Sequence, residues 1–430
     1  MNREVIKNQP MFFKNKEFLN AIKILNEGIY AADPAYCLKP FFLKNRIKIK
    51  KSVINLEIFD NVYIIAIGKA ADSMARLVSK KVNFKHGMVV LPSNYKPVFS
   101  NKKFLFFKAG HPLPNLQSFK ASQYLEKLVS DIKKNDFVIF LISGGGSALV
   151  SHPMGISLKE KIAVNNELIH CGANINEISC VRKHLSEVKG GKITQKMNCK
   201  GISLIISDVI GDDLSSISSG LTFADKTTFS QALKILQKYK IHKKVSKNVI
   251  RVLEMGAKNK FPETPKKSKI RNIVVANNNN SLIAMKDKAE SMNYSPGVIR
   301  ALNSDVSVAA KKIKKIMRKR NKSCIIFGGE TTVNVTGEGK GGRNQELVLH
   351  LFKELQNDHN YIISSIGTDG IDGNTKFAGA IISTRSILPF KNYLRNNDSF
   401  NFYKKSGGLI KTGPTHTNVN DIGLIIRQNP

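Results

Sequence analysis

Long hydrophobic runs are absent from this sequence of 430 residues. No stretch of eighteen consecutive apolar residues occurs, so neither a transmembrane helix nor a membrane partner is expected. The first residues, Met1–Val5, are polar and lead into no apolar segment, which argues against a signal peptide. The sequence therefore predicts a protein of the cytoplasm.

Cysteine is scarce, and the few cysteines are not paired along the chain. The five residues are scattered, odd in number and without a C-x-x-C pair. This pattern predicts free, buried thiols in a reducing compartment rather than disulfides. The cysteines concerned are Cys37, Cys171, Cys180, Cys199 and Cys324.

Acidic residues are also few. The 32 Asp and Glu residues stand against 68 Lys and Arg, which gives a formal net charge of +36. Such a charge fits nucleic-acid binding, anionic substrates or a lysine-rich background. The lysines are spread over the whole chain, and the clusters Lys44–Lys51 and Lys311–Arg320 contain too few aromatic residues for base stacking. We therefore expect anionic substrates or a lysine-rich background, and no nucleic-acid partner. The cluster Lys311–Arg320 also predicts an amphipathic helix with a solvated basic face.

The nucleotide-binding motifs of the common kinases are missing as well. There is no G-x-x-x-x-G-K-[ST] pattern and no H-R-D or D-F-G set, so any kinase here is of another type. A G-x-G-x-x-G pattern does occur at Gly337–Gly342 before an expected helix. We discount it as a dinucleotide site, because the preceding segment Thr331–Thr336 alternates polar and apolar residues and predicts a half-exposed strand. Arg343, directly after the last glycine, indicates instead a loop built around a guanidinium.

What the sequence does contain is a glycine loop at the end of an apolar strand. The run Asp136–Phe140 predicts a buried strand, and it leads into Leu141–Val150, which holds three consecutive glycines between Ser143 and Ser147. Glycines let the backbone turn sharply and bring several N–H groups to one anion, and the two serines add hydroxyl donors. A strand, a glycine loop and a helix start predict a phosphate site. The alternative is a flexible surface loop.

Strand–crossover–strand units recur at least four times in the first half of the chain, which predicts a parallel sheet with helices on both faces. Such sheets bind ligands beyond the carboxyl ends of their strands. Lys69 follows the strand Asn61–Ile67, and Asp208 follows Gly201–Ser207. We expect them to share a site with the glycine loop, although Lys69 could also be an ordinary surface lysine.

Two further acids, Asp212 and Asp213, follow Asp208 closely. A carboxylate at the end of a buried strand holds Mg²⁺ in many phosphoryl-transfer enzymes, so this group predicts a magnesium site. The alternative for Asp212 and Asp213 is helix N-capping. The small, polar segment Ser215–Thr222 could line the same cleft.

Other segments give expectations about organisation. The helix predicted at Glu177–Val188 and the turn after it carry Arg182, Lys183, His184 and Lys189, for which a solvated basic face is the default. A helix is predicted at Phe12–Ala32 and another at Phe229–Gly256. The segment Lys258–Lys269 contains two prolines and predicts a linker. The expected domains are 1–257 and 258–430, with a new α/β region starting at residues 272–276.

A series of collinear motifs covers nearly the whole chain and resembles one family. They are Ala66–Ala71, Ala109–Pro112, Ser143–Leu149, Val181–Leu185, Ser207–Val209 with Gly211–Asp213, Gly328–Val333, Gly341–Glu346, Gly367–Gly373, Thr412–Thr415 and Thr417–Asp421. Together they resemble the MOFRL-type (class II) glycerate 2-kinases, a family often labelled hydroxypyruvate reductase. The departures are Leu221 where proline is usual, Asn115 where aspartate is frequent, and His416 where glycine or another small residue is common.

The resemblance implies a fold and an activity. The implied fold is α/β, with a parallel-sheet Rossmann-like N-terminal domain, a smaller mixed α/β C-terminal domain and an active site in the cleft. The implied reaction is the ATP-dependent phosphorylation of D-glycerate at its 2-hydroxyl, giving 2-phosphoglycerate and ADP, with Mg²⁺ as cofactor. A homodimer is left open as the assembly. The family's active-site lysine and arginine fall on Lys69 and Arg343.

These assignments give a working hypothesis for the site. The loop residues Ser143, Gly144, Gly145, Gly146 and Ser147, together with Gly329 and Glu330, are expected to bind ATP phosphates, and Asp208, Asp212 and Asp213 the metal. Lys69 and Arg343 would hold the glycerate carboxylate and the transferring phosphoryl group, with Asn418 also at the substrate. Asp369 could accept the substrate proton, ligate metal or fix a turn. The competing function, a hydroxypyruvate reductase using NAD(P)H, is supported only by the discounted glycine pattern.

Overall fold

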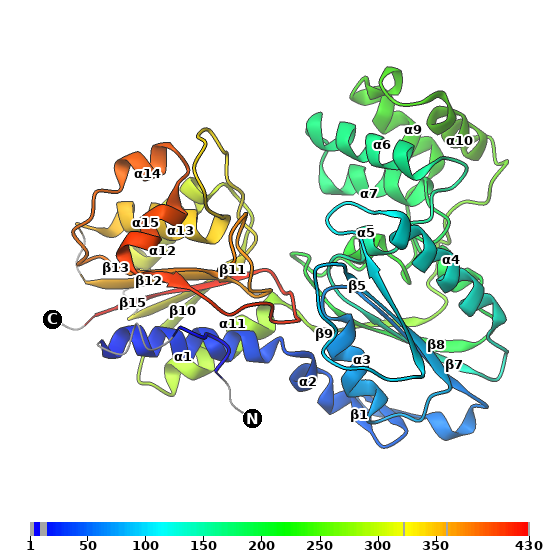
Figure 1. The fold of residues 1–430 in the computed structure, drawn as a ribbon, viewed down its shortest axis with the longest axis horizontal. Helices are drawn as coiled ribbons and strands as arrows, with labels where there is room; N and C mark the ends of the chain where they lie inside the picture. Colours follow the sequence, from blue (N-terminus) through cyan, green and yellow to red (C-terminus); the bar gives the residue numbers. More distant parts are fainter. Residues whose placement is uncertain (1–3, 9–14, 321–322, 358–359, 429–430) are drawn as a thin grey trace. The chain divides into compact units, whose positions relative to one another are not determined.

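A six-stranded sheet organises the middle of the chain (Figure 1). The computed structural model describes residues 4–8, 15–320, 323–357 and 360–428. Its contacts divide the chain into two compact units. The central unit is Leu38–Val275, and the terminal unit combines Met1–Cys37 with Ala276–Pro430.

The sheet of the central unit has the order β6-β5-β4-β7-β8-β9. Strands β4 to β8 pair in parallel, and numbering the six strands along the chain gives the order 3-2-1-4-5-6 of a Rossmann-like sheet. The predicted fold class is thereby confirmed for this unit. The strands are β4 (Val62–Ile67), β5 (His86–Pro92), β6 (Phe104–Ala109), β7 (Phe137–Ile142), β8 (Lys200–Ile206) and β9 (Arg271–Ala276).

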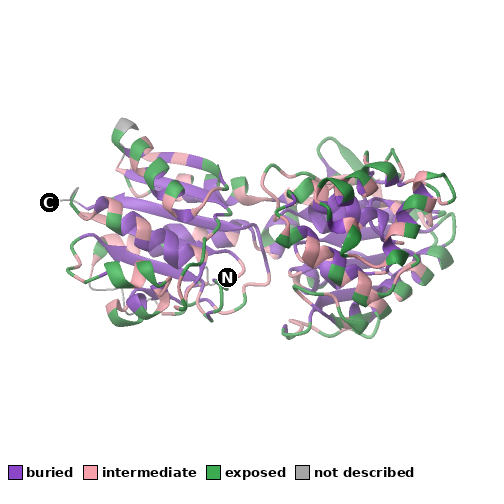
Figure 2. Ribbon diagram, turned by 90° about the horizontal axis from the view of Figure 1, so that it is seen from above, coloured by how far each residue is buried: buried purple, intermediate pink, exposed green. Residues whose placement is uncertain are grey.

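Strands β4 and β7 are buried at every position. This is why they appear in the sequence as continuous apolar runs, since a strand covered on both faces has no polar side. Figure 2 shows the same concentration of buried residues along the strands of each unit. A small antiparallel sheet precedes them, formed by β1 (Phe42–Leu43), β2 (Arg46–Ile49) and β3 (Ser52–Asn55).

Helices of the central unit fall into two groups. The first comprises α3 (Ala71–Ser79), α4 (Leu116–Asp131), the single-turn α5 (Gly146–Leu149) and α8 (Lys192–Gln195), of which α3 and α4 pack beside the sheet. The second has a hydrophobic core of its own and comprises α6 (Leu158–His170), α7 (Ile175–His184), α9 (Phe229–Lys238) and α10 (Lys247–Ala257). The single long helix predicted at Phe229–Gly256 is wrong, because the chain turns through the 3-10 segment Ile241–Lys243 between α9 and α10.

The terminal unit contains a mixed sheet with the order β10-β11-β15-β12-β13-β14. Only β10 and β11 pair in parallel; β15 lies antiparallel between β11 and β12. The predicted mixed α/β character is confirmed. The strands are β10 (Pro296–Leu302), β11 (Cys324–Gly329), β12 (Tyr361–Gly367), β13 (Gly379–Ser383), β14 (Leu409–Ile410) and β15 (Asp421–Arg427).

Two helical layers cover this sheet. On one face lie α12 (Val306–Arg320), α13 (Arg343–Leu355) and α15 (Ser399–Ser406), and on the other lie α1 (Lys16–Ala31) and α11 (Asn278–Glu290) (Figure 1). Alternate residues of β11 serve the two cores: Ile325 faces the first layer and Ile326 the second. This unit also contains the short helices α2 (Pro34–Cys37) and α14 (Lys391–Arg395).

The unit boundaries differ from the predicted ranges. The predicted helix from Phe12 is seen as α1, with residues 12–14 outside the described part, and α1 packs against α11 and β15 of the terminal unit. At the other boundary, β9 is the sixth strand of the central sheet and does not open a new α/β region. Apolar patterning reveals each element, but not which sheet it joins.

Other expectations concern single segments. The strand predicted at Thr331–Thr336 is wrong: the structure has only an isolated bridge from Thr332 to Asp305 there. All five cysteines are free, as predicted, and all but the partly exposed Cys171 are buried. No helix within the described ranges combines the length and hydrophobicity needed to span a bilayer.

Candidate active site

The glycine loop lies where the strand order of the central sheet reverses. Strands β4 and β7 are neighbours in the sheet, and from them the chain continues in opposite directions across it. Open α/β sheets bind ligands beyond the carboxyl ends of the strands at this switch point. The residues that follow β4 and β7 are Gly68–Ala70 and Ser143–Ser147. The structure therefore brings Lys69 and the glycine loop together, as the sequence predicts.

The two segments are in direct contact. The Lys69 N–H donates to the Gly144 carbonyl at 2.9 Å, and the Ala70 N–H donates to Ser143 Oγ at 3.0 Å. Gly68 has a φ of +129°, and a Cβ placed on it would lie 2.2 Å from Ser143 Oγ. Only glycine allows this approach. A Cβ on Gly145 would meet the His111 ring at 3.0 Å and the Lys69 side chain at 3.6 Å, so both side chains border the loop.

The carbonyls of the three loop glycines accept hydrogen bonds from backbone N–H groups of the protein. Gly144 O accepts from Lys69, Gly145 O from the Ala148 N–H, and Gly146 O from the Val150 N–H. The N–H groups of the three glycines are not among the donors found within the described part of the chain. A loop with its carbonyls paired and its N–H groups open suits an anion.

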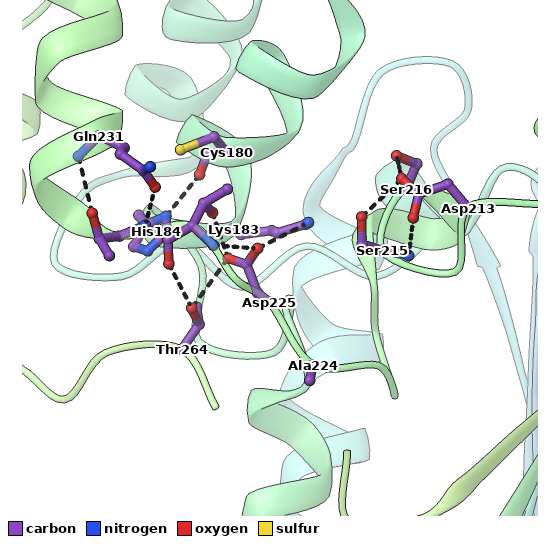
Figure 3. A network of polar contacts seen from close by, with 12 residues as sticks. Cys180, Lys183, His184, Asp213, Ser215, Ser216, Ala224, Asp225, Gln231 and Thr264 are labelled. Atoms are coloured by element: carbon purple, nitrogen blue, oxygen red, sulfur yellow. Dashed lines mark hydrogen bonds and ion pairs between the residues drawn. The ribbon is translucent and has the colours of Figure 1, made fainter. Parts of the chain in front are cut away.

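The segment after β8 contributes Asp208, because β8 pairs with β7. Asp213 is engaged locally: its carboxylate accepts from the Ser215 N–H at 3.0 Å, Ser215 Oγ at 2.8 Å and Ser216 Oγ at 2.6 Å (Figure 3). These bonds fix a turn. They are not the predicted helix N-cap, because the next helical segment, the 3-10 turn Ile217–Ser219, has Ser216 as its N-cap. No cluster of three or more His, Cys, Asp or Glu side chains fit to hold a metal is found in the described ranges. Asp208 and Asp212 belong to the same segment, and the magnesium site expected at these acids stays a prediction.

Of the basic residues of α7 and the turn after it, Lys183, His184 and Lys189 are buried and Arg182 is half-buried, so the solvated face expected for them is wrong. Lys183 is 2% exposed and pairs with Asp225 at 3.3 Å, and Asp225 also accepts from Thr264 Oγ1 at 3.1 Å (Figure 3). His184 lies beside the Cys180 carbonyl and Glu263, at 2.8 and 3.2 Å. These residues tie the 223–228 and 263–266 segments to α7.

The terminal unit holds Arg343 in a second polar cluster. The guanidinium donates to Asp421 through Nε at 2.6 Å and Nη2 at 3.0 Å, and Nη1 lies 3.2 Å from Glu330. Burial lowers the pKa of Arg343, but the neighbouring carboxylates of Asp421 and Glu330 outweigh it and hold the pKa above its usual value. Asp421 begins β15 and is paired in register with Gly329 and Gly367, the last residues of β11 and β12. The predicted loop around a guanidinium is thus a strand-end cluster.

Asp372 caps the helix that Arg343 begins. Its buried carboxylate accepts from the Asn344 N–H at 3.0 Å and the Gln345 N–H at 2.9 Å, and from both side-chain amides. An acid of this chain therefore occupies the N-terminus of α13, the place where a dinucleotide pyrophosphate would bind after a G-x-G-x-x-G pattern. This geometry agrees with the expectation that Gly337–Gly342 is not a dinucleotide site.

The other predicted residues of this unit lie at the same sheet edge. Asp369 Oδ1 accepts from the Ile371 N–H at 3.1 Å, which suits the turn-fixing alternative. The Glu330 N–H donates to Leu302 O at 2.7 Å, so this amide is already used by the fold. Asn418 is 8% exposed and accepts from the Asn420 N–H at 3.2 Å. His416, a departure from the family pattern, has a φ of +56°, a conformation that glycine adopts without strain.

Comparisons with known proteins agree with this arrangement. Family models match residues 20–254 (a domain of unknown function, DUF4147) and 323–421 (the MOFRL family). The chain is 38% identical to a D-glycerate 2-kinase of Thermotoga maritima, covering 94% of this chain and 98% of that protein. It is 35% identical to a glycerate 2-kinase of Pyrococcus horikoshii, with coverages of 94% and 96%. The chain belongs to the MOFRL-type glycerate 2-kinase family.

A crystal structure of a family member supports the fold. The glycerate kinase of Thermotoga maritima superposes with a TM-score of 0.81 at 34% identity, covering 94% of this chain and 98% of that one. The glycerate 2-kinase resemblance drawn from the motifs is thereby confirmed. From the sequence, Asp421 belongs to a family motif without an assigned role, Ser218 and Ser219 lie in a segment that could line the cleft, and Lys189 is expected on a solvated face. Their importance depends on contacts between distant segments, which no local pattern shows.

Proposed function

We propose that this protein transfers a phosphoryl group from ATP to the 2-hydroxyl of D-glycerate, giving 2-phosphoglycerate and ADP. The observation that carries the proposal is similarity over nearly the whole chain to proteins named as glycerate 2-kinases. A chain that shares 38% of its residues across 98% of a D-glycerate 2-kinase keeps both units that such a kinase uses. This enzyme phosphorylates glycerate.

Phosphoryl transfer depends on alignment and charge neutralisation rather than on covalent chemistry. In the proposed mechanism the N–H groups of Gly144 to Gly146 and the Ser147 hydroxyl bind ATP phosphates. Lys69, next to this loop, neutralises charge on the phosphoryl group. Arg343 binds an anionic group of the substrate with the donors that Asp421 leaves available, since a guanidinium offers five N–H donors.

A magnesium ion would neutralise phosphate charge when bound with the nucleotide. Asp208, at the carboxyl edge of the central sheet beside the glycine loop, is the residue that would hold it in this proposal. Asp369 remains the candidate to accept the proton of the substrate hydroxyl. Its carboxylate is half-buried, and one of its oxygens holds the Ile371 N–H.

The geometry around Gly337–Gly342 does not support the glycine pattern on which the reductase alternative rests. The single glycine pattern that could suggest a nicotinamide site precedes a helix whose N-terminus is capped by Asp372. The segment before that pattern is not the buried strand that a dinucleotide fold uses. We therefore favour the kinase.

A coupled assay tests the reaction and its position. Purified protein is mixed with D-glycerate, ATP, Mg²⁺, enolase and pyruvate kinase, without phosphoglycerate mutase. Pyruvate formation is the signal, and it is expected without mutase because enolase accepts 2-phosphoglycerate. Signal that appears only after mutase is added would indicate 3-phosphorylation, and NAD(P)H consumption with hydroxypyruvate in place of kinase activity would establish the reductase.

Variants in the same assay test the site. Lys69→Ala should lower kcat by at least about a hundredfold, as expected for loss of a charged group that stabilises the transition state. Lys80→Ala, at the exposed end of the helix that follows Lys69, serves as the matched control. Near-normal turnover in Lys69→Ala would overturn the assigned role.

A further inference from the structure

A buried lysine binds the backbone of the glycine loop but has no role in the reaction proposed above. Lys189 follows α7 and is 2% exposed. Its Nζ donates to the Gly146 carbonyl at 2.7 Å and to the Ser218 carbonyl at 3.1 Å. One side chain therefore joins the phosphate loop to a segment far along the chain.

The three segments involved form a unit that we call the loop clasp, comprising Ser143–Ser147, Lys189–Gly191 and Ser218–Gly220. Ser218 Oγ donates to Ser143 O at 3.2 Å, and the hydroxyls of Ser147 and Ser219 lie 2.8 Å apart. Backbone bonds join the other two segments: the N–H groups of Gly190 and Gly191 donate to the Ser219 and Gly220 carbonyls at 3.0 and 2.7 Å.

The clasp holds backbone that would not adopt its conformation alone. Ser218 and Ser219 have φ values of +50° and +57°, in the left-handed region that serine rarely occupies. Consecutive residues in this region persist only where surrounding contacts impose it. A Cβ on Gly146 would lie 2.2 Å from Ser218 Oγ, so the segments touch without spare room.

The turn that carries Lys189 is itself anchored. A Cβ on Gly190 would lie 3.1 Å from Thr264, 3.3 Å from Asp225 and 3.4 Å from Lys183, which are joined by the buried polar network of Figure 3. Burial, with Lys161 and Arg182 nearby, holds the pKa of Lys189 well below its usual value. The contact does not depend on charge, because a neutral amine still has two hydrogens for two carbonyls.

We propose that Lys189 is a positioning residue for nucleotide binding: it fixes the Gly146 and Ser218 carbonyls so that the N–H groups of the glycine loop are preorganised for ATP phosphates. This inference rests on the proposed function. The Gly146 carbonyl and the Ser147 N–H belong to one planar peptide and point in opposite directions. Binding of this carbonyl by Lys189 therefore directs the Ser147 N–H away from the lysine. Without that contact the loop must be ordered by the nucleotide, at the expense of affinity.

The test compares Lys189→Met with Lys192→Met. Lys192 is a half-buried lysine three residues further on. Its Nζ donates to Ser186 O at 2.7 Å and is not among the donors to the loop carbonyls that Lys189 binds. Melting temperature, Kd for ATP by calorimetry, and KM for ATP and glycerate are measured for both. Lys189→Met should raise Kd and KM for ATP at least about tenfold and change KM for glycerate less than about twofold. Lys192→Met should lower the melting temperature without the selective loss of ATP affinity.

A second pair keeps the test decisive if Lys189→Met does not fold. Gly146→Ala places a methyl group against Ser218 and should raise KM for ATP in the same selective way. The double variant Gly146→Ala/Ser218→Gly removes the colliding side chain at a position whose φ suits glycine, and should recover part of the loss.

The outcomes separate the inference from the proposed function. Wild-type protein that neither binds nor uses ATP would overturn the kinase proposal itself. An active wild type, with a folded Lys189→Met that keeps its ATP affinity, would overturn only the role of Lys189. Equal loss of affinity for ATP and glycerate in Lys189→Met, matched by Lys192→Met, would show a merely structural role and also overturn it.

Discussion

At the scale of single residues, the orientation of the Arg343 guanidinium depends on one carboxylate, that of Asp421. Asp421 holds Arg343 through two nitrogens and also accepts from Asn344 Nδ2 at 3.0 Å. Bidentate pairing sets the plane of a guanidinium as well as its position. The direction of the remaining donors of Arg343, and hence the anion they can bind, follows from Asp421.

Asp421→Asn should therefore separate orientation from charge. The variant keeps the shape of the side chain but replaces one acceptor oxygen by an NH2 group, so Arg343 loses its fixed plane. We expect kcat/KM for glycerate to fall about tenfold to a hundredfold, with Kd for ATP changed less than about twofold. Asp287→Asn, at an exposed position of α11, is the matched control. A folded Asp421→Asn with wild-type kcat/KM would show that Asp421 does not set the orientation of Arg343.

A second residue-scale consequence concerns pH. Glu346 is 2% exposed, and burial raises its pKa from 4.5 to about 7; burial likewise raises the pKa of Asp372 to about 6. Because the folded-state pKa of Glu346 is the higher one, its contribution to stability is complete below about pH 4.5 and is lost as the pH rises through about 7.

Glu346→Gln removes this titration. The difference in unfolding free energy between the variant and the wild type should shift in favour of the variant by up to about 3 kcal/mol between pH 5 and pH 8. Chemical denaturation at a series of pH values measures it. Glu290→Gln, an exposed glutamate paired with Lys286, should show no comparable shift. Parallel pH profiles for wild type and Glu346→Gln would contradict the assignment.

Residues of the site differed in how far the sequence could predict them. Lys69 and Ser143–Ser147 could be placed together because each directly follows a strand with an unmistakable apolar run. The bond from Arg343 to Asp421 could not, because it depends on β15 lying between β11 and β12 with Asp421 opposite both strand ends. The burial of Lys189 could not be predicted either, because nothing in the local sequence distinguishes a buried lysine from a solvated one among 68 Lys and Arg residues.

At the scale of elements, the fold assigns some segments against their place in the sequence. The buried strands of the central sheet were predictable, since helices on both faces leave them continuously apolar. The placement of β9 was not predictable. The proline-containing segment before it has the composition of a linker, which suggests a new domain, but β9 is the sixth strand of the central sheet. In the same way, α1 near the start of the chain packs against β15 near its end.

The packing of α1 gives a test of that assignment. A Cβ on Gly28 would lie 2.7 Å from Ile422 Cδ1 in β15 and 2.8 Å from Met285 in α11. Gly28→Leu should destabilise the terminal unit by about 1–3 kcal/mol through overpacking. Hydrogen exchange should quicken in α11 and β15 and stay unchanged in β4 and β7. Lys23→Leu, on the exposed side of α1, is the control, and faster exchange in the central sheet would contradict the division into units.

At the scale of the whole molecule, the excess of positive charge is the feature that the fold does not require. The net charge of +36 is carried by residues spread over both units, and the proposed substrates are both anions. A field of one sign raises the local concentration of anionic ligands and their rate of association. The same charge would repel other copies of the chain, which bears on the homodimer that remains a prediction.

Salt should therefore change the rate of substrate association more than the rate of the chemical step. Raising KCl from about 0.02 to 0.3 M shortens the Debye length severalfold, so kcat/KM for ATP should fall severalfold while kcat changes less than about twofold. Steady-state kinetics across the series measures both, and repeating it with potassium acetate separates screening from competition by a particular anion. A fall that depends on which anion is present would indicate occupation of the phosphate loop by the salt itself. If kcat/KM is independent of salt, the lysines are a compositional background, and the selective anion binding resides in the glycine loop, Lys69 and Arg343 alone.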